Sequence, residues 1–130
     1  MSGHKADYIN YRITKAIEAL DAAKVLAENK SWNACINRLY YACYYSVSAL
    51  LLSNNISTQT HAGLKTQFNF HFIKSGPIDS KYGKLFAELM DSRQKGDYGD
   101  MFDFDEEKVN PLIKPVEEFV NMIIALIKAE

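Results

Sequence analysis

Apolar residues return every three or four positions in five segments of the 130-residue chain, the spacing of helices that bury one side. Phenylalanines at every second position from 68 to 72 would suit a strand, but no second segment offers such a strand a partner. The pattern therefore predicts an all-α fold with helices over residues 7–29, 33–52, 60–75, 80–95 and 110–127.

Polar residues mark where these helices should begin. Ser31 is a candidate N-cap for the second helix, and the short connection at 29–31 predicts that the first two helices are antiparallel neighbours. The acidic run at 103–107 suits the start of the last helix, where the helix dipole favours negative charge. The candidate caps of the third and fourth helices are Ser57, Thr58, Thr60, Asp79 and Ser80.

Glycine and proline mark where the helices should end. Gly76-Pro77 should stop the third helix, and the two glycines within 95–100 should supply a turn after the fourth. Pro111 and Pro115 predict a kink or a late start near residue 110 in the last helix.

The second predicted helix is the most apolar, yet it carries one arginine and four tyrosines. Its core face should hold Trp32, Ile36, Leu39, Tyr40, Cys43, Val47 and Leu50. The opposite side, called the second face here, holds Ala34, Asn37, Arg38, Tyr41, Tyr45, Ser48 and Ala49. Because the second face mixes small residues with a charge and two phenols, we expect function there.

Composition and charge limit the class of protein. With 48% hydrophobic and 24% charged residues, the chain should form one domain over 1–130, with 1–6 as a flexible tail. The net charge is −1, and the 15 basic residues form no stripe, which gives no support to non-specific nucleic-acid binding. A local basic pocket stays open as an interpretation, because a dimer can bring two copies of one arginine together.

Cysteine spacing and hydropathy exclude further classes. Cys35 and Cys43 lie eight residues apart, about 12 Å along a helix, so they cannot bond to each other. No group of cysteines and histidines has metal-ligand spacing, so we expect neither a metal nor a cofactor. The polar N-terminus and the lack of a long apolar run predict a cytoplasmic protein that does not enter a membrane.

Arg38 is the sharpest candidate, because a buried arginine is costly without a partner. It could lie at a subunit contact or pair with an acidic residue such as Asp97. It could instead bind a phosphate or stabilise a phosphoryl transition state. The two interpretations agree if the site spans a dimer.

Tyr45 and His61 complete the candidate catalytic set. Tyr45 follows Arg38 by two turns and points the same way, so it could orient a group, donate a proton or stack on a nucleobase. His61 begins the third helix, where a cap or surface role is commoner than catalysis. His71 falls on an apolar stripe and should be a core histidine.

Candidate binding residues lie near the catalytic set in the predicted fold. Arg93 and Asp97 are four residues apart and should form an ion pair on one helix. With Tyr98 they make a polar group at a helix end that could flank a cleft. The candidates are Asn37, Tyr41, Arg93, Asp97 and Tyr98.

Four segments between residues 32 and 119 follow in a distinctive order. They are Arg38-Leu-Tyr-Tyr-Ala-Cys-Tyr-Tyr, Thr60-His-Ala-Gly-Leu, His71-Phe-Ile-Lys-Ser-Gly and Arg93-Gln-Lys-Gly-Asp-Tyr-Gly. In these segments the chain resembles a prokaryotic branch of the HEPN domains. That resemblance implies a five-helix up-and-down bundle that dimerises, and often a minimal nucleotidyltransferase as partner.

The same resemblance implies a site. In active members an arginine and a histidine, separated by a short spacer, meet their copies across the dimer and form a metal-independent RNase. Many such proteins are toxins or defence factors restrained by the nucleotidyltransferase. Arg38 matches the motif arginine, but the expected histidine positions hold Cys43, Tyr44 and Tyr45.

Three hypotheses follow. The first is a dimeric protein of a toxin–antitoxin or defence system that binds RNA or a nucleotide around Arg38, with weak or lost RNase activity. The second is an active metal-independent endoribonuclease that uses His61 or Tyr45 in place of the motif histidine. The third is a purely structural partner-binding module in which Arg38 is buried in a salt bridge.

Overall fold

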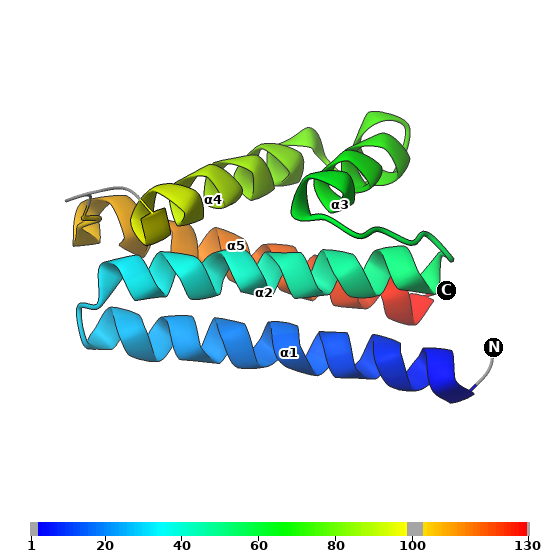
Figure 1. Cartoon of the computed structure of the whole chain (residues 1–130), viewed down its shortest axis with the longest axis horizontal. Coiled ribbons are helices and arrows are strands. Elements are labelled where there is room, and N and C mark those ends of the chain that lie inside the picture. Colours follow the sequence, from blue (N-terminus) through cyan, green and yellow to red (C-terminus); the bar gives the residue numbers. More distant parts are fainter. Residues whose placement is uncertain (1–2, 99–102, 130) are drawn as a thin grey trace.

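The computed structural model describes residues 3–98 and 103–129. Within those ranges the chain is helical and contains no strand, which confirms the all-α prediction. The elements are α1 (Gly3–Glu28), α2 (Trp32–Ser53), α3 (His61–Phe68), the π-helix η1 (Asn69–Lys74), α4 (Ser80–Tyr98) and α5 (Glu106–Ala129) (Figure 1).

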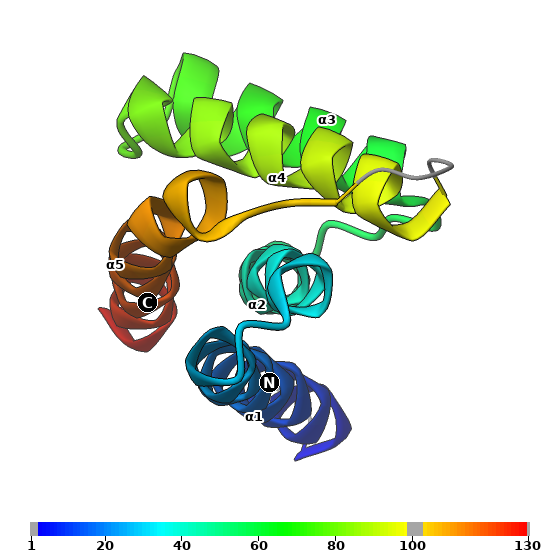
Figure 2. The same ribbon diagram turned by 90° about the vertical axis from the view of Figure 1, so that its left-hand side faces the viewer.

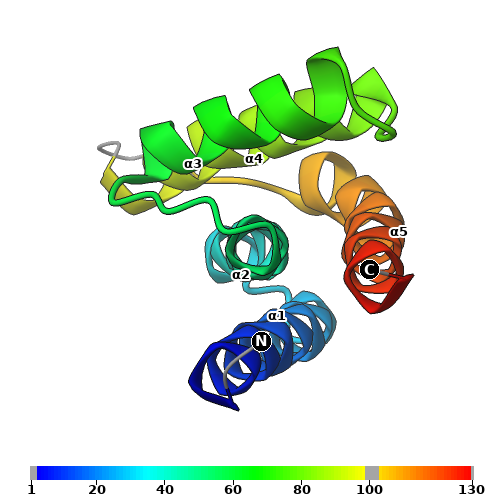
Figure 3. The same cartoon turned by 90° about the vertical axis from the view of Figure 1, so that its right-hand side faces the viewer.

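α2 lies at the centre of the bundle. Viewed along the long axis from either end, it has α1 on one side, α4 on the opposite side and α5 between them (Figures 2 and 3). α3 and η1 lie beside α4, and the chain reverses direction between η1 and α4. The α3–α4 pair lies obliquely across the other three helices. The first and last helices have their free ends at the same end of the bundle (Figure 1).

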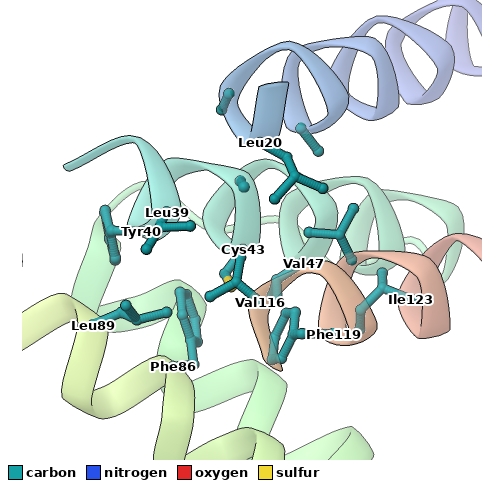
Figure 4. Close-up of a cluster of buried hydrophobic side chains, with 14 of the residues drawn as sticks. Leu20, Leu39, Tyr40, Cys43, Val47, Phe86, Leu89, Val116, Phe119 and Ile123 are labelled. Carbon is teal, nitrogen blue, oxygen red and sulfur yellow. The ribbon is translucent and has the colours of Figure 1, made fainter. Parts of the chain in front are cut away.

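The core forms where α2 meets α4 and α5. Tyr40, Cys43 and Val47 of α2 point toward Phe86 of α4 and Phe119 of α5 (Figure 4). The predicted core face of α2 is fully buried apart from Trp32, which is partly buried at the first turn. Hydrophobic burial on this face therefore fixes the orientation of the central helix.

α1 and α2 meet through small side chains. Ala16 and Ala23 of α1 are fully buried, and the Cys35 thiol donates a hydrogen bond to the Ala23 carbonyl at 3.3 Å. Ala49 follows Cys35 by four helical turns on the same side of α2, and it is fully buried. Its predicted place on the second face is therefore wrong, because that edge of α2 packs toward α1.

Several predicted helix ends shift. α1 begins at Gly3, so residues 3–6 are helical rather than part of a tail. α5 begins at Glu106 and includes Pro111 and Pro115, so the predicted late start is wrong. The Asp105 carboxylate accepts from the Lys108 amide at 3.0 Å, and this cap fixes the earlier start within the acidic run.

The third helix changes its hydrogen-bonding period. Thr60 caps it as predicted, accepting from the Gly63 amide at 2.9 Å. After Phe68 the chain continues as the π-helix η1, whose wider turn displaces later side chains from the stripe. His71 is consequently exposed and contacts Gln67 at 3.1 Å, so its predicted core position is wrong.

The fourth helix continues into the segment where the sequence predicted a turn. α4 continues to Tyr98, so Gly96 is helical. A Cβ at Gly96 would lie 3.1 Å from a ring carbon of Phe104. The glycine therefore admits the segment before α5 close to α4, instead of reversing the chain.

Candidate functional site

The second face of α2 is the side that its neighbouring helices leave open. Ala34 and Arg38 are exposed, while Asn37, Tyr41 and Tyr45 are partly buried along its edges. α1 borders this face on one side, and the start of α3 and the end of α4 border it on the other. The fold thus brings candidate residues from three helices to one surface.

Arg38 is exposed, which differs from the buried arginine that the sequence predicted. Its guanidinium carbon lies 5.6 Å from the centroid of the Tyr41 ring. Within residues 3–98 and 103–129, no carboxylate lies within ion-pairing distance of Arg38, so the predicted pairing with Asp97 is not formed. An unpaired charge at this position costs little free energy, because the second face is open to solvent and water can solvate the guanidinium.

Arg93 of α4 approaches the same aromatic group from the other side. Its guanidinium carbon lies 5.0 Å from the Tyr40 centroid and 5.8 Å from the Tyr41 centroid. Tyr41 therefore has two guanidinium groups within about 6 Å of its ring, the range of cation–π attraction. Because Arg93 also pairs with Asp97, Arg38 supplies the positive charge that this surface offers to an anion.

The predicted ion pair of Arg93 with Asp97 is confirmed, with 3.6 Å between Nη1 and Oδ2. The Asn37 amide donates to the same Asp97 oxygen at 2.9 Å. Among the residues that the structure describes, Arg93 Nε and Asn37 Oδ1 are buried without hydrogen-bond partners. Buried polar atoms are rarely left unsatisfied, so this network has capacity for a further polar partner. The side chain of Tyr98, the fifth binding candidate, lies outside the described residues.

His61 packs against the tyrosines of α2. Its ring stacks on Tyr44 at 4.4 Å between centroids, and the Tyr41 centroid lies 6.1 Å from it with the two rings nearly perpendicular. Because Arg38 lies over Tyr41, that ring connects Arg38 to His61. The start of α3 therefore does fold against α2, although His61 reaches the tyrosines rather than the guanidinium of Arg38.

The protonation of His61 follows from its partner. Its Nδ1 lies 2.5 Å from the hydroxyl of Tyr40, which is fully buried. We assign the Tyr40 hydroxyl as the donor, because no other acceptor among the described residues contacts it; Nδ1 then accepts, and Nε2 carries the ring hydrogen in the neutral form. Burial, with a contribution from Arg93, lowers the pKa of His61. His61 thus suits hydrogen-bond donation better than proton abstraction.

Tyr40 is the site residue that sequence reasoning placed only in the core. It is buried, and its ring stacks on Phe86 at 5.8 Å, so the core prediction is confirmed. Its hydroxyl nevertheless holds His61, and burial raises its pKa well above the ordinary phenol value. The helical wheel places Tyr40 between the two faces, which is the signal that could have shown this double role.

Tyr45 lies at the other edge of the second face. Its ring centroid is 5.9 Å from Tyr41 and 5.5 Å from Tyr44. It lines a groove of about 570 Å³ between α1 and α2, together with Ser48 and Arg12. The candidate catalytic residues Arg38, Tyr45 and His61 therefore each contact the ring of Tyr41.

Metal chemistry has no support among the described side chains. No group of three or more histidine, cysteine or acidic residues there could hold a metal ion. Cys35 and Cys43 are free and buried, and burial raises the pKa of the Cys35 thiol to about 11. In those same ranges no helix is long and apolar enough to cross a lipid bilayer.

Comparison with known proteins identifies the fold family. The model of the HEPN domain matches residues 9–127. A Thermotoga maritima protein named UPF0332 protein is 39% identical over 124 residues, which cover 95% of this chain and 94% of that protein. A Methanocaldococcus jannaschii protein whose name marks it as a candidate toxin is 36% identical over 113 residues, 87% of this chain and 84% of that protein. The chain belongs to the HEPN domain family.

Proposed function

We propose that this protein is a dimeric, toxin-like HEPN protein that binds RNA or a nucleotide at a site centred on Arg38. The observation that carries the proposal is the exposed guanidinium of Arg38, which shares the Tyr41 ring with Arg93. A phosphate placed there would meet the accessible positive charge of Arg38, whereas the charge of Arg93 is already paired with Asp97. The toxin names of two relatives support the wider system type.

Weak or lost RNase activity is part of the proposal. Cys43, one of the positions where the family resemblance implies a histidine, is fully buried on the opposite side of α2 from Arg38. Nδ1 of His61 is already engaged as the hydrogen-bond acceptor of the Tyr40 hydroxyl, so a general base would have to come from elsewhere. In this proposal Arg38 holds the phosphate, but no described residue beside it is placed as the general base that would activate the ribose hydroxyl.

A homodimer would complete the site. The second face is open, and a second copy related by two-fold symmetry would bring another Arg38 toward the first. A minimal nucleotidyltransferase is the partner that the family resemblance implies. Sedimentation of the purified protein should give twice the chain mass, and co-expression with a neighbouring nucleotidyltransferase should give a joint complex.

Arg38→Gln tests the site directly. Binding of a short fluorescent oligoribonucleotide should weaken by about tenfold or more, and the salt dependence should decrease because a phosphate contact is lost. Lys114→Gln makes the same charge change at an exposed position on α5 and should leave binding near wild type. Equal binding by the Arg38 variant and wild type would contradict the proposal.

Active nuclease is the second candidate, favoured by the position of His61 beside Tyr41 and Tyr44. Single-stranded RNA should stay intact with the purified protein when metal ions are chelated. Cleavage that is lost in both His61→Gln and Tyr45→Phe would instead establish the nuclease.

A further inference from the structure

A groove between α1 and α2 borders the Arg38 site and has a distinct chemistry. Its volume is about 570 Å³, within the range of small-molecule sites. Within residues 3–98 and 103–129, no aliphatic side chain contributes to its lining. The residues that line it are Asp7, Tyr8, Tyr11, Arg12, Tyr44, Tyr45 and Ser48.

Two of its tyrosines are unusually accessible. Tyr8 is 62% exposed and Tyr11 is 59% exposed, although both belong to a helix that packs on the core. Single exposed aromatic residues are common, but these two stand three residues apart on one wall of a groove that Tyr44 and Tyr45 also line. Exposed ring faces beside a groove are what a nucleobase needs for stacking.

Cations accompany these rings. The Arg12 guanidinium is held in place by the Ser48 carbonyl at 3.2 Å, and the Lys15 ammonium lies 5.4 Å from the Tyr11 centroid. Tyr45 also contacts the ring of Tyr41, and the guanidinium of Arg38 lies over that ring. Aromatic rings therefore alternate with positive charges from α1 to the middle of α2.

We propose that this groove is a base-stacking subsite for single-stranded RNA whose phosphate is held at Arg38. This inference rests on the proposed function and names its substrate class. Bases stack on Tyr8 and Tyr11, while Arg12 and Lys15 lie beside the backbone. Asp7 repels phosphate but accepts hydrogen bonds from the amino or imino groups of a base, so it favours the base edge over the backbone.

A second copy of the chain fits this groove less well. The core of a subunit contact is depleted of acidic residues, whereas Asp7 is one of the residues that line this groove. The exposed aliphatic residues of α1, Ile17 and Val25, do not contribute to the lining. The aromatic content favours a planar ligand, and Arg38 supplies the charge that attracts its phosphate, because Asp7 and Arg12 of the lining offset each other.

The experiment compares two RNA probes. One is a short fluorescent oligoribonucleotide, and the other has the same length and charge but carries abasic residues. Tyr8→Leu combined with Tyr11→Leu should weaken binding of the first probe by about tenfold and change binding of the second less than about twofold. Phe70→Leu is the matched control, because Phe70 is 58% exposed on η1, away from α1. Arg38→Gln should weaken binding of both probes.

The outcomes separate the two proposals. If the double variant binds the base-containing probe as tightly as wild type while Arg38→Gln does not, the subsite is overturned and the Arg38 site stands. If wild-type protein binds neither probe, the proposed function fails first. If the double variant changes the oligomeric mass, the groove is a contact between copies, which also overturns the subsite. Circular dichroism should show that each variant keeps its helical fold.

Discussion

At the scale of single residues, the contact of Tyr40 with His61 changes the meaning of both side chains. One is a core aromatic and the other a helix-start histidine, and either alone would be unremarkable in a helical bundle. Together they place a neutral imidazole beside the rings of Tyr40 and Tyr41. The guanidinium of Arg93 lies over the first ring, and that of Arg38 lies over the second. The pair therefore sets the tautomer that the site presents to a ligand.

This pair predicts a dependence of stability on pH. The pKa of His61 is lowered from 6.5, so the unfolded chain binds more protons than the folded chain as the pH falls below that value. The contribution of His61 to stability is complete above about pH 6.5 and declines as the pH falls toward the folded pKa. Urea unfolding between pH 7 and pH 5 should show this decline.

His61→Gln supplies the comparison for that measurement. It removes the titrating group, so the variant should lose less stability than wild type over the same pH interval. A slope equal to that of wild type would show that other groups cause the decline.

Residue-level prediction from the sequence succeeded where geometry along one helix was enough. Arg38 and Tyr45 share a face because they are seven residues apart, and Arg93 pairs with Asp97 because they are four apart. The contacts of Arg93 with Tyr40 and of Tyr40 with His61 could not be predicted, because they depend on how α3 and α4 cross α2. Helical periodicity contains no information about those crossings.

At the scale of elements, the helix starts offer a matched comparison of caps. Thr60 accepts a hydrogen bond from the Gly63 amide, whereas Ser31 occupies the N-cap position of α2 without a side-chain hydrogen bond. Thr60→Ala should lower the free energy of unfolding by about 1 kcal/mol, and Ser31→Ala should change it by only a few tenths. Urea denaturation of both variants checks this, and equal losses would contradict it.

Helix existence was predictable for all five α-helices, but several of their boundaries were not. The proline pair in α5 suggested a late start, yet the Asp105 cap and the burial of Val109 hold the first turn in place. The π-helix after Phe68 was missed, because a change from α to π hydrogen bonding leaves no mark in the apolar pattern. Local signals compete at such points, and tertiary packing decides between them.

At the scale of the whole molecule, the central position of α2 predicts the order in which regions open. Most of α2 from Cys35 to Leu51 is buried, whereas η1 has no buried residue. Amides of α2 should exchange with solvent only through global unfolding, and those of η1 through local opening. Hydrogen exchange followed by mass spectrometry should therefore find α2 slowest, and faster exchange in α2 than in η1 would contradict this.

The common end of the first and last helices has a practical consequence. Tyr8 lies only five residues after Gly3, about 8 Å along α1, so the proposed stacking subsite begins next to the start of the first helix. A purification tag on that helix would compete with RNA for the tyrosine groove and should be removed before binding is measured. A small fluorophore attached at the same place would instead report directly when the groove is occupied.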